Sequence, residues 1–169
     1  MSAPSDIRQA AAVANGFYAV YGTFHPSDGI PDTAERAKLE PVISPALDTL
    51  LRDAAAAEKH FADSTKHQAP PLIEGDLFTS NFEGATAWHV GTCRISGNEA
   101  RCPVAFGYRG NATEDAKPVN WTDSLSLART NAGWRVDDIG YGGTAEFGNN
   151  GRLTETLRSA IRDGNSTPP

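Results

Sequence analysis

Apolar and polar residues alternate on both sides of a turn signal in Asn120–Tyr141, and this pattern predicts a β-hairpin. Every second side chain from Trp121 to Leu127 falls on one face, because strand side chains alternate with a period of two. Asn131–Gly133 supplies the turn, and Gly133 is free to adopt a positive φ there. Trp134 then begins a second alternating strand. We expect the rest of the chain to be organised around this hairpin.

Apolar residues at helical spacing predict helices before and after the strands. The expected helices are Ser5–Thr23, a short helix from Asp32 or Thr33 to Leu39, a longer one from Ser44 through Phe61, and Arg152–Asp163, which Gly164 ends. Leu72–Gly84 is expected to be a partly buried connector with one helical turn. Together the elements predict a single domain, residues 5–164, with flexible termini at 1–4 and 165–169.

A second hairpin is predicted from Ala85–Ile95 and Glu99–Tyr108, with a two-residue turn at Gly97–Asn98. In that register Cys93 lies directly opposite Cys102, in the closer, non-hydrogen-bonded type of pair. We favour a disulfide between the two cysteines. The alternative is a pair of reduced, buried thiols that serve as small apolar side chains.

The same register assigns the faces of the second hairpin. It places His89 on the face of Phe106, and it places Trp88 and Val90 on the opposite face with Pro103. Because Pro103 has no N–H to donate to a neighbouring strand, it predicts a bulge or a sheet edge.

The order of the elements predicts the fold class. No helix alternates with the strands, so a doubly wound parallel sheet is not expected. The chain instead predicts an α+β protein, in which amino-terminal helices pack on a curved antiparallel sheet of four or more strands and a carboxy-terminal helix follows.

The totals fit one globular domain: 169 residues, 39% hydrophobic and 21% charged. A net charge of -6 argues against sequence-independent binding to nucleic acid, which needs a basic surface. No apolar run is long enough to span a membrane, and Met1–Asp6 lacks the basic start and apolar stretch of a signal peptide. A disulfide would imply an oxidising compartment. We therefore expect a periplasmic or secreted protein whose signal peptide has been removed.

Three stretches carry a family resemblance: Phe17–Tyr21, Asp76–Ser80, and Trp121–Leu125 continuing through Gly133–Tyr141. Together they resemble an uncharacterised family of bacterial periplasmic proteins and lipoproteins within the nuclear transport factor two-like superfamily. The resemblance implies a cone-shaped sheet around amino-terminal helices, an envelope location and no known catalysis. Some envelope domains of this size are immunity proteins that block a secreted toxin, and the resemblance allows that role. No lipid-accepting cysteine lies near the start of the chain.

Some relatives in that superfamily are isomerases or dehydratases that use His and Asp inside the cone. His89 and Asp123 are the corresponding candidates here, because a His polarised by a carboxylate acts as a general base near neutral pH. We favour structural roles for both, with the His89 nitrogens satisfied by backbone groups and Asp123 paired with Arg129 or Arg135. No catalytic residue is therefore assigned.

Other chemistry has weak support in the sequence. Asp137 and Asp138 point to opposite sides of a strand, so we expect one to face solvent and the other to anchor backbone donors or an arginine. The cysteines lack further metal ligands, and His60 and His67 do not share a helix face, so no metal site is expected. Gly140–Thr144 lacks the lysine of a phosphate-binding loop, and no cofactor is expected.

Two loops are the predicted interface. Arg109–Pro118 is long, polar and charged, as recognition loops on a rigid sheet often are, although a solvated hairpin tip is the alternative. The candidate binding residues come from this loop and from the Tyr141–Phe147 loop: Tyr108, Arg109, Glu114, Asp115, Tyr141 and Phe147.

The hypothesis from the sequence is a non-enzymatic envelope domain that binds a protein, either a secreted toxin or another envelope protein. An immunity protein is its specific form, and a homo-oligomer is left open. The rival hypothesis is a small-molecule binder or isomerase-like enzyme with a cone pocket lined by His89, Phe106 and Asp123.

Overall fold

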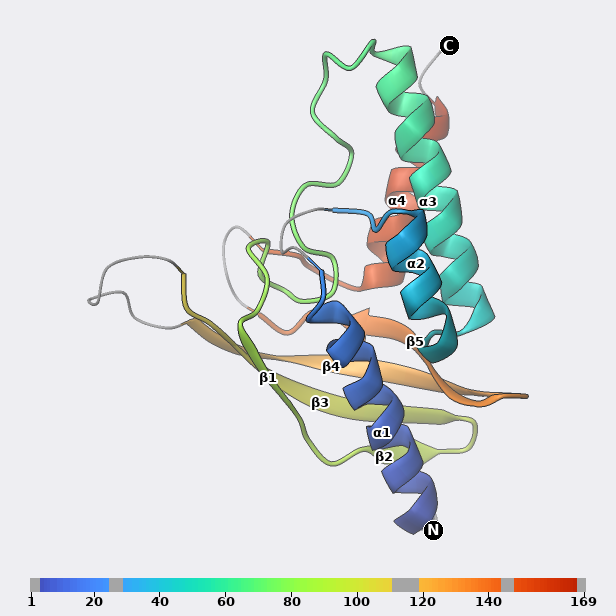
Figure 1. Ribbon diagram of the computed structural model, residues 1–169, viewed down its shortest axis with the longest axis vertical. Coiled ribbons are helices and arrows are strands. Elements are labelled where there is room, and N and C mark those ends of the chain that lie inside the picture. Colours follow the sequence, from blue (N-terminus) through green and yellow to red (C-terminus); the bar gives the residue numbers. More distant parts are fainter. Residues whose placement is uncertain (1–3, 25–28, 111–118, 144–147, 167–169) are drawn as a thin grey trace.

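The computed structural model describes residues 4–24, 29–110, 119–143 and 148–166. Its elements follow the predicted order (Figure 1). In chain order they are α1 (Pro4–Tyr21), α2 (Thr33–Leu39), the 3₁₀ turn η1 (Glu40–Val42), α3 (Pro45–Ser64), β1 (Ala87–Val90), β2 (Arg94–Ser96), β3 (Glu99–Tyr108), β4 (Val119–Thr130), β5 (Gly133–Gly140) and α4 (Leu153–Ser166). None of the described helices is long and apolar enough to cross a membrane.

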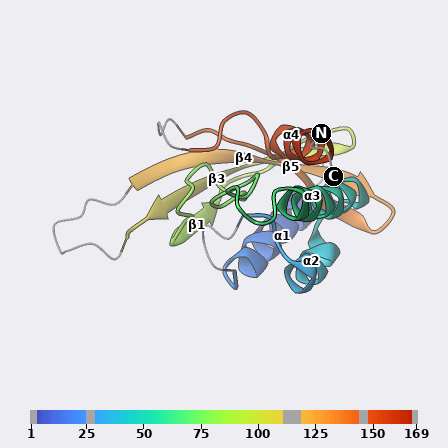
Figure 2. The ribbon, with the colours of Figure 1, turned by 90° about the horizontal axis from the view of Figure 1, so that it is seen from above.

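The strands form one antiparallel, five-stranded sheet in the order β1–β3–β4–β5, and β2 pairs with the same edge of β3 as β1. Helix α1 crosses one face of this curved sheet, and α3 and α4 lie side by side and contact it at β5 (Figures 1 and 2). The α+β class is therefore confirmed, with amino-terminal helices packed on a curved antiparallel sheet and a carboxy-terminal helix.

Two helices begin where their cap residues predicted. The Asp32 carboxylate accepts from the Glu35 N–H at 2.8 Å, and the Glu35 carboxylate accepts from the Asp32 N–H at 2.9 Å. Ser44 Oγ accepts from the Leu47 N–H at 3.1 Å, and Pro45 occupies the first helical position, where no donor is needed.

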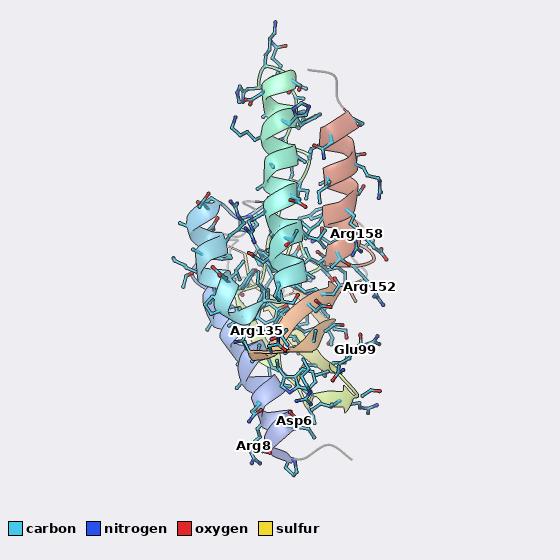
Figure 3. The ribbon with its side chains drawn as sticks, turned by 90° about the vertical axis from the view of Figure 1, so that its right-hand side faces the viewer. Asp6, Arg8, Glu99, Arg135, Arg152 and Arg158 are labelled. Carbon is cyan, nitrogen blue, oxygen red and sulfur yellow. A yellow bond between two sulfur atoms is a disulfide. The ribbon has the colours of Figure 1, made fainter. Side chains whose placement is uncertain are left out.

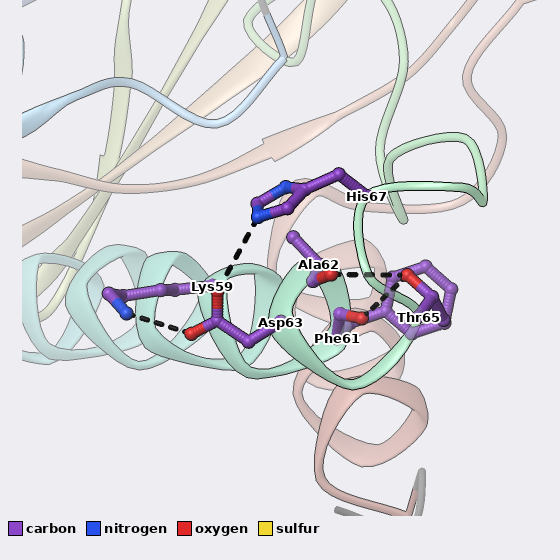
Figure 4. A network of polar contacts seen from close by, with 6 residues as sticks. All are labelled: Lys59, Phe61, Ala62, Asp63, Thr65 and His67. Carbon is purple, nitrogen blue, oxygen red and sulfur yellow. Dashed lines mark hydrogen bonds and ion pairs between the residues drawn. The ribbon is translucent and has the colours of Figure 1, made fainter.

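Local hydrogen bonds and ion pairs stabilise the carboxy-terminal end of α3 (Figure 4). Thr65 Oγ1 donates to the Phe61 carbonyl oxygen at 2.9 Å. Asp63 lies between Lys59 Nζ at 2.8 Å and His67 Nε2 at 3.7 Å. His67 adopts a φ of 59°, so the chain reverses here and enters the loop before the sheet.

Helix α4 continues past its predicted end. Gly164, which was expected to stop the helix, lies inside α4 and is buried against Ala57 of α3. A Cβ at this position would lie 2.5 Å from the Ala57 carbonyl oxygen, so the absence of a side chain lets the two helices approach closely.

The core extends from α1 and the sheet to α3 and α4, and its part between α1 and the sheet is rich in aromatic rings. Phe17 and Tyr18 of α1 are completely buried. The Tyr18 ring lies edge-on to Phe106 of β3 at 5.1 Å, and the Phe17 ring lies edge-on to Phe78 at 5.6 Å, a favourable geometry for ring pairs. Because Phe78 belongs to the connector before the sheet, that connector is part of the core.

The central hairpin has the predicted faces and turn. Alternate side chains of Asp123–Leu127 are buried. Thr130 pairs with Gly133, which adopts a φ of 104° as expected for the turn. The β4–β5 register shifts between Ser126 and Leu127, where β5 carries one extra residue.

The predicted disulfide is present. Arg94 lies opposite Arg101, so Cys93 and Cys102 face each other with their Cα atoms 4.1 Å apart and their sulfur atoms bonded. Both cysteines are buried on the core side of the sheet.

A bulge follows the cysteines along β3. Val90 lies opposite Val104, so the three residues Gly91–Cys93 span two residues of the partner strand. The Gly91 N–H donates to the Pro103 carbonyl oxygen at 2.7 Å, and this confirms the irregularity predicted at Pro103.

The extra residue reverses the faces of β1. Trp88 lies opposite Phe106 and packs against the core, whereas His89 lies opposite Ala105 and is exposed. The faces predicted for Trp88, His89 and Val90 are therefore wrong, because a shift of one residue exchanges the two faces of a strand.

Candidate functional site

The Asp76–Ser80 connector fills one end of the space between α1 and the sheet. None of its residues is more than 5% exposed. The prediction of a partly buried connector over Leu72–Gly84 is confirmed, but this stretch, which is described in full, contains no helical turn. The polar side chains of Asp76–Ser80 point inward, where they meet polar groups from α1, β4 and the segment after β5.

Asp123 of β4 is the main acceptor in this buried cluster. Its carboxylate accepts from the Ser80 N–H at 2.9 Å, the Gly142 N–H at 2.8 Å and the Trp121 Nε1–H at 3.2 Å, and also from the Ser80 hydroxyl. The carboxylate therefore joins three segments of the chain and is 2% exposed.

The pairing of Asp123 with an arginine is wrong, because both candidate arginines bind elsewhere. Arg129 Nη2 lies 2.6 Å from Asp6 Oδ2 at the start of α1, and its guanidinium stacks on Trp134 at 4.3 Å. Arg135 donates to the Trp134 carbonyl oxygen at 2.7 Å. Figure 3 shows Asp6 near the amino-terminal end of α1, beside the sheet that carries Arg135.

Asp76 is the second buried carboxylate. It accepts from the Tyr21 hydroxyl at 2.8 Å, the Phe78 N–H at 3.1 Å and the Thr79 hydroxyl at 3.1 Å. Burial raises the pKa of Asp76 to about 6, although these hydrogen bonds favour the ionised form. Asp76 is therefore poised to change charge in mildly acidic solution.

Other polar groups hold the connector backbone. The Tyr141 hydroxyl donates to the Leu77 carbonyl oxygen at 2.5 Å, and the Tyr18 hydroxyl donates to that of Phe78 at 3.0 Å. Burial raises the pKa of both tyrosines, so their hydroxyls stay protonated donors. Asn149 Nδ2 donates to the carbonyl oxygens of Asp76 and Thr79 at 2.6 and 2.7 Å.

The structure does not bring the two predicted catalytic candidates together. Asp123 lies opposite Val104 on the core face, and His89 is exposed on the other face of the sheet. A pocket lined by His89, Phe106 and Asp123 therefore does not form. The buried carboxylates are occupied by hydrogen bonds to the connector.

The two carboxylates of β5 anchor neighbouring segments. Asp137 accepts from the Ser44 hydroxyl at 2.6 Å. Asp138 accepts from the Thr154 N–H at 3.0 Å at the start of α4, and lies 3.8 Å from Arg152, which Figure 3 labels. The anchoring role predicted for one of them is seen for both.

The predicted interface residues fall into three groups. Tyr141 is committed to the connector, as described above. Arg109 is exposed, and the Tyr108 hydroxyl donates to the Glu83 carboxylate, a bond that raises the pKa of Tyr108. Glu114, Asp115 and Phe147 lie outside the described residues.

The sequence pattern gives no signal for Phe82, which is 36% exposed and lies two residues after the buried connector. Nor does it predict the hollow of about 250 Å³ beside Ser80, Trp121 and Gly143. Both follow from the path of the connector, which the sequence pattern left ambiguous. The described residues contain no group of three or more His, Cys, Asp or Glu side chains placed to hold a metal ion. No protein-family model matches the chain, and no curated protein matches it.

Proposed function

We propose that this chain is a non-enzymatic domain that binds another protein through its surface. The observation that carries the proposal is the role of Asp76 and Asp123, whose carboxylates are buried and accept hydrogen bonds from the connector at one end of the interior. A general base must reach a substrate proton, and these carboxylates are covered by the chain itself. Because these interior groups cannot reach a substrate, we propose that the protein recognises its partner through surface residues.

We further propose a periplasmic location in a bacterium, with an immunity protein against a secreted toxin as the specific role. The Cys93–Cys102 disulfide supports an oxidising compartment. The sheet wrapped over amino-terminal helices supports the resemblance to the nuclear transport factor two-like superfamily. The net charge of -6 favours a partner with a basic surface.

The test is capture of a partner from envelope and secreted fractions by the tagged, oxidised protein, with intact mass to count free thiols. We expect one stoichiometric protein partner and a mass lower by two hydrogens. An oxidised protein without any protein partner would contradict the binding function, and two free thiols would contradict the location.

A second candidate, small-molecule binding, is favoured by the hollow beside Ser80 and Trp121, where an aromatic ring adjoins a hydroxyl. A ligand screen read by thermal shift tests it. We expect a ligand of this hollow to lose its effect when Trp121 is replaced by Leu.

A further inference from the structure

Two hollows join into one groove between the Pro70–Gly75 loop and α4. Their volumes are about 570 Å³ and 420 Å³, and both are lined by Leu72, Ile73 and Thr156. The loop is fixed to α3, because the Leu72 N–H donates to both carboxylate oxygens of Glu58 at 3.0 and 2.9 Å. Leu72 and Ile73 therefore give the groove an apolar part on a supported backbone, whereas its side along α4 is largely polar.

Phe82 lies at one end of this groove, where its aromatic ring is exposed and its backbone is held in place. Its carbonyl oxygen accepts from the Asp76 N–H at 2.9 Å, which ties the turn to the buried connector. Gly75 adopts a φ of 88°, and a Cβ there would lie 2.9 Å from the Phe82 Cβ. The backbone that carries this ring is therefore held in place, which lowers the conformational entropy that must be lost when a partner binds.

The rim of the groove is acidic. Glu74, Glu83 and Glu155 line it, and all three are exposed. Neither Glu74 nor Glu155 forms an ion pair with another described residue. Among the described lining residues Arg162 is the one basic side chain, and Asp163 lies beside it in the sequence. The resulting negative potential favours lysine or arginine side chains.

We infer that this groove binds an extended segment of the partner protein that carries both apolar and basic side chains. Apolar side chains would cover Leu72, Ile73 and Phe82, while lysines or arginines would meet the carboxylates on the rim. The hydrogen bond from Tyr108 to Glu83 places the groove next to the start of the Arg109–Pro118 loop, the interface predicted from sequence. The inference rests on the proposed protein-binding function and names its surface and its partner chemistry.

Labelled hexapeptides test the partner chemistry directly, with fluorescence anisotropy as the readout. One peptide alternates lysine and leucine, a second alternates glutamate and leucine, and a third alternates lysine and serine. We expect the lysine–leucine peptide to bind at least about tenfold more tightly than either of the others, a difference of about 1.4 kcal/mol. Equal binding of all three, or no binding of the first, overturns the inference.

Matched variants test the place of binding. Phe82→Ser and Glu74→Lys are each expected to weaken the lysine–leucine peptide about tenfold. Their controls are Val119→Ser, at the other exposed large apolar residue among those described, and Glu99→Lys on the β2–β3 hairpin, labelled in Figure 3. The controls are expected to stay within about twofold of the parent protein. Thermal unfolding shows whether each variant is folded. If Phe82→Ser and Glu74→Lys lose no more peptide affinity than the controls, the groove is not the binding site.

A captured partner separates this inference from the proposed function. If the parent protein captures a partner that Phe82→Ser and Glu74→Lys bind equally well, the groove is wrong and the protein-binding function stands. If the parent captures none, the binding function fails, and the inference that rests on it fails too.

Discussion

Asp123 is a single side chain that we expect to make a large contribution to stability, because it holds the Asp76–Ser80 connector against β4. Its carboxylate accepts from two backbone N–H groups, of Ser80 and Gly142, which are otherwise deprived of water. Replacing it with Leu leaves these buried donors without an acceptor, and each such loss costs about 1–3 kcal/mol. We therefore expect Asp123→Leu to lower the free energy of unfolding by about 3 kcal/mol in urea denaturation.

The neighbouring Thr122 provides the control, because it lies on the exposed face of the same strand. Thr122→Ala is expected to change the free energy of unfolding by no more than about 0.5 kcal/mol. Similar small effects for both variants would show that Asp123 does not hold the connector.

At the scale of whole elements, replacing two helical glycines with alanine is expected to have opposite effects on stability. A Cβ on Gly164 of α4 would lie 2.5 Å from the Ala57 carbonyl oxygen, whereas a Cβ on Gly16 of α1 has its nearest neighbour at 3.6 Å, on Val42. Alanine is favoured over glycine inside a helix by about 1 kcal/mol. We expect Gly16→Ala to stabilise the protein by up to about 1 kcal/mol and Gly164→Ala to destabilise it, because α3 and α4 must move apart. Thermal unfolding measures both, and stabilisation by Gly164→Ala would disprove the close helix contact.

The β2–β3 hairpin carries a second prediction at this scale. Its disulfide joins residues nine apart in sequence, and closing so short a loop in the unfolded chain is worth about 2–3 kcal/mol. The double variant Cys93→Ala/Cys102→Ala should lose about that much stability in urea denaturation. Adding a reductant should then destabilise the parent protein and leave the variant unchanged. A parent protein that is insensitive to complete reduction would contradict this stabilising role.

This hairpin also shows what the sequence could and could not predict. Gly97–Asn98 fixes the turn, and with it the register of the cysteines, because few turn types fit two residues. Pro103 predicts an irregularity because it has no N–H to donate, but this property does not determine how many extra residues the bulge contains. That single extra residue moved His89 to the exposed face and so removed it from the candidate site.

For the molecule as a whole, the helices, strands and class followed from periodicity, whereas the site depended on contacts between distant segments. The Asp76–Ser80 connector has no period of its own. It is held by Tyr21, Asp123 and Asn149, which come from three separate parts of the chain. Their convergence depends on where the sheet and helices meet, and local pattern carries no signal for that.

The buried connector links global stability to pH through Asp76. Because burial raises the pKa of Asp76 to about 6 in the folded protein, from an ordinary value of 3.8, ionising it costs more in the folded state than in the unfolded chain. The stability from protonated Asp76 is fully present below about pH 4 and is lost as the pH rises through about 6. This loss amounts to about 3 kcal/mol. Asp76→Asn, which stays neutral, should therefore lose less stability than the parent protein between pH 4 and 7, when urea denaturation is compared at the two values. Parallel pH profiles for the two proteins would mean that Asp76 ionises in the fold as readily as in the unfolded chain.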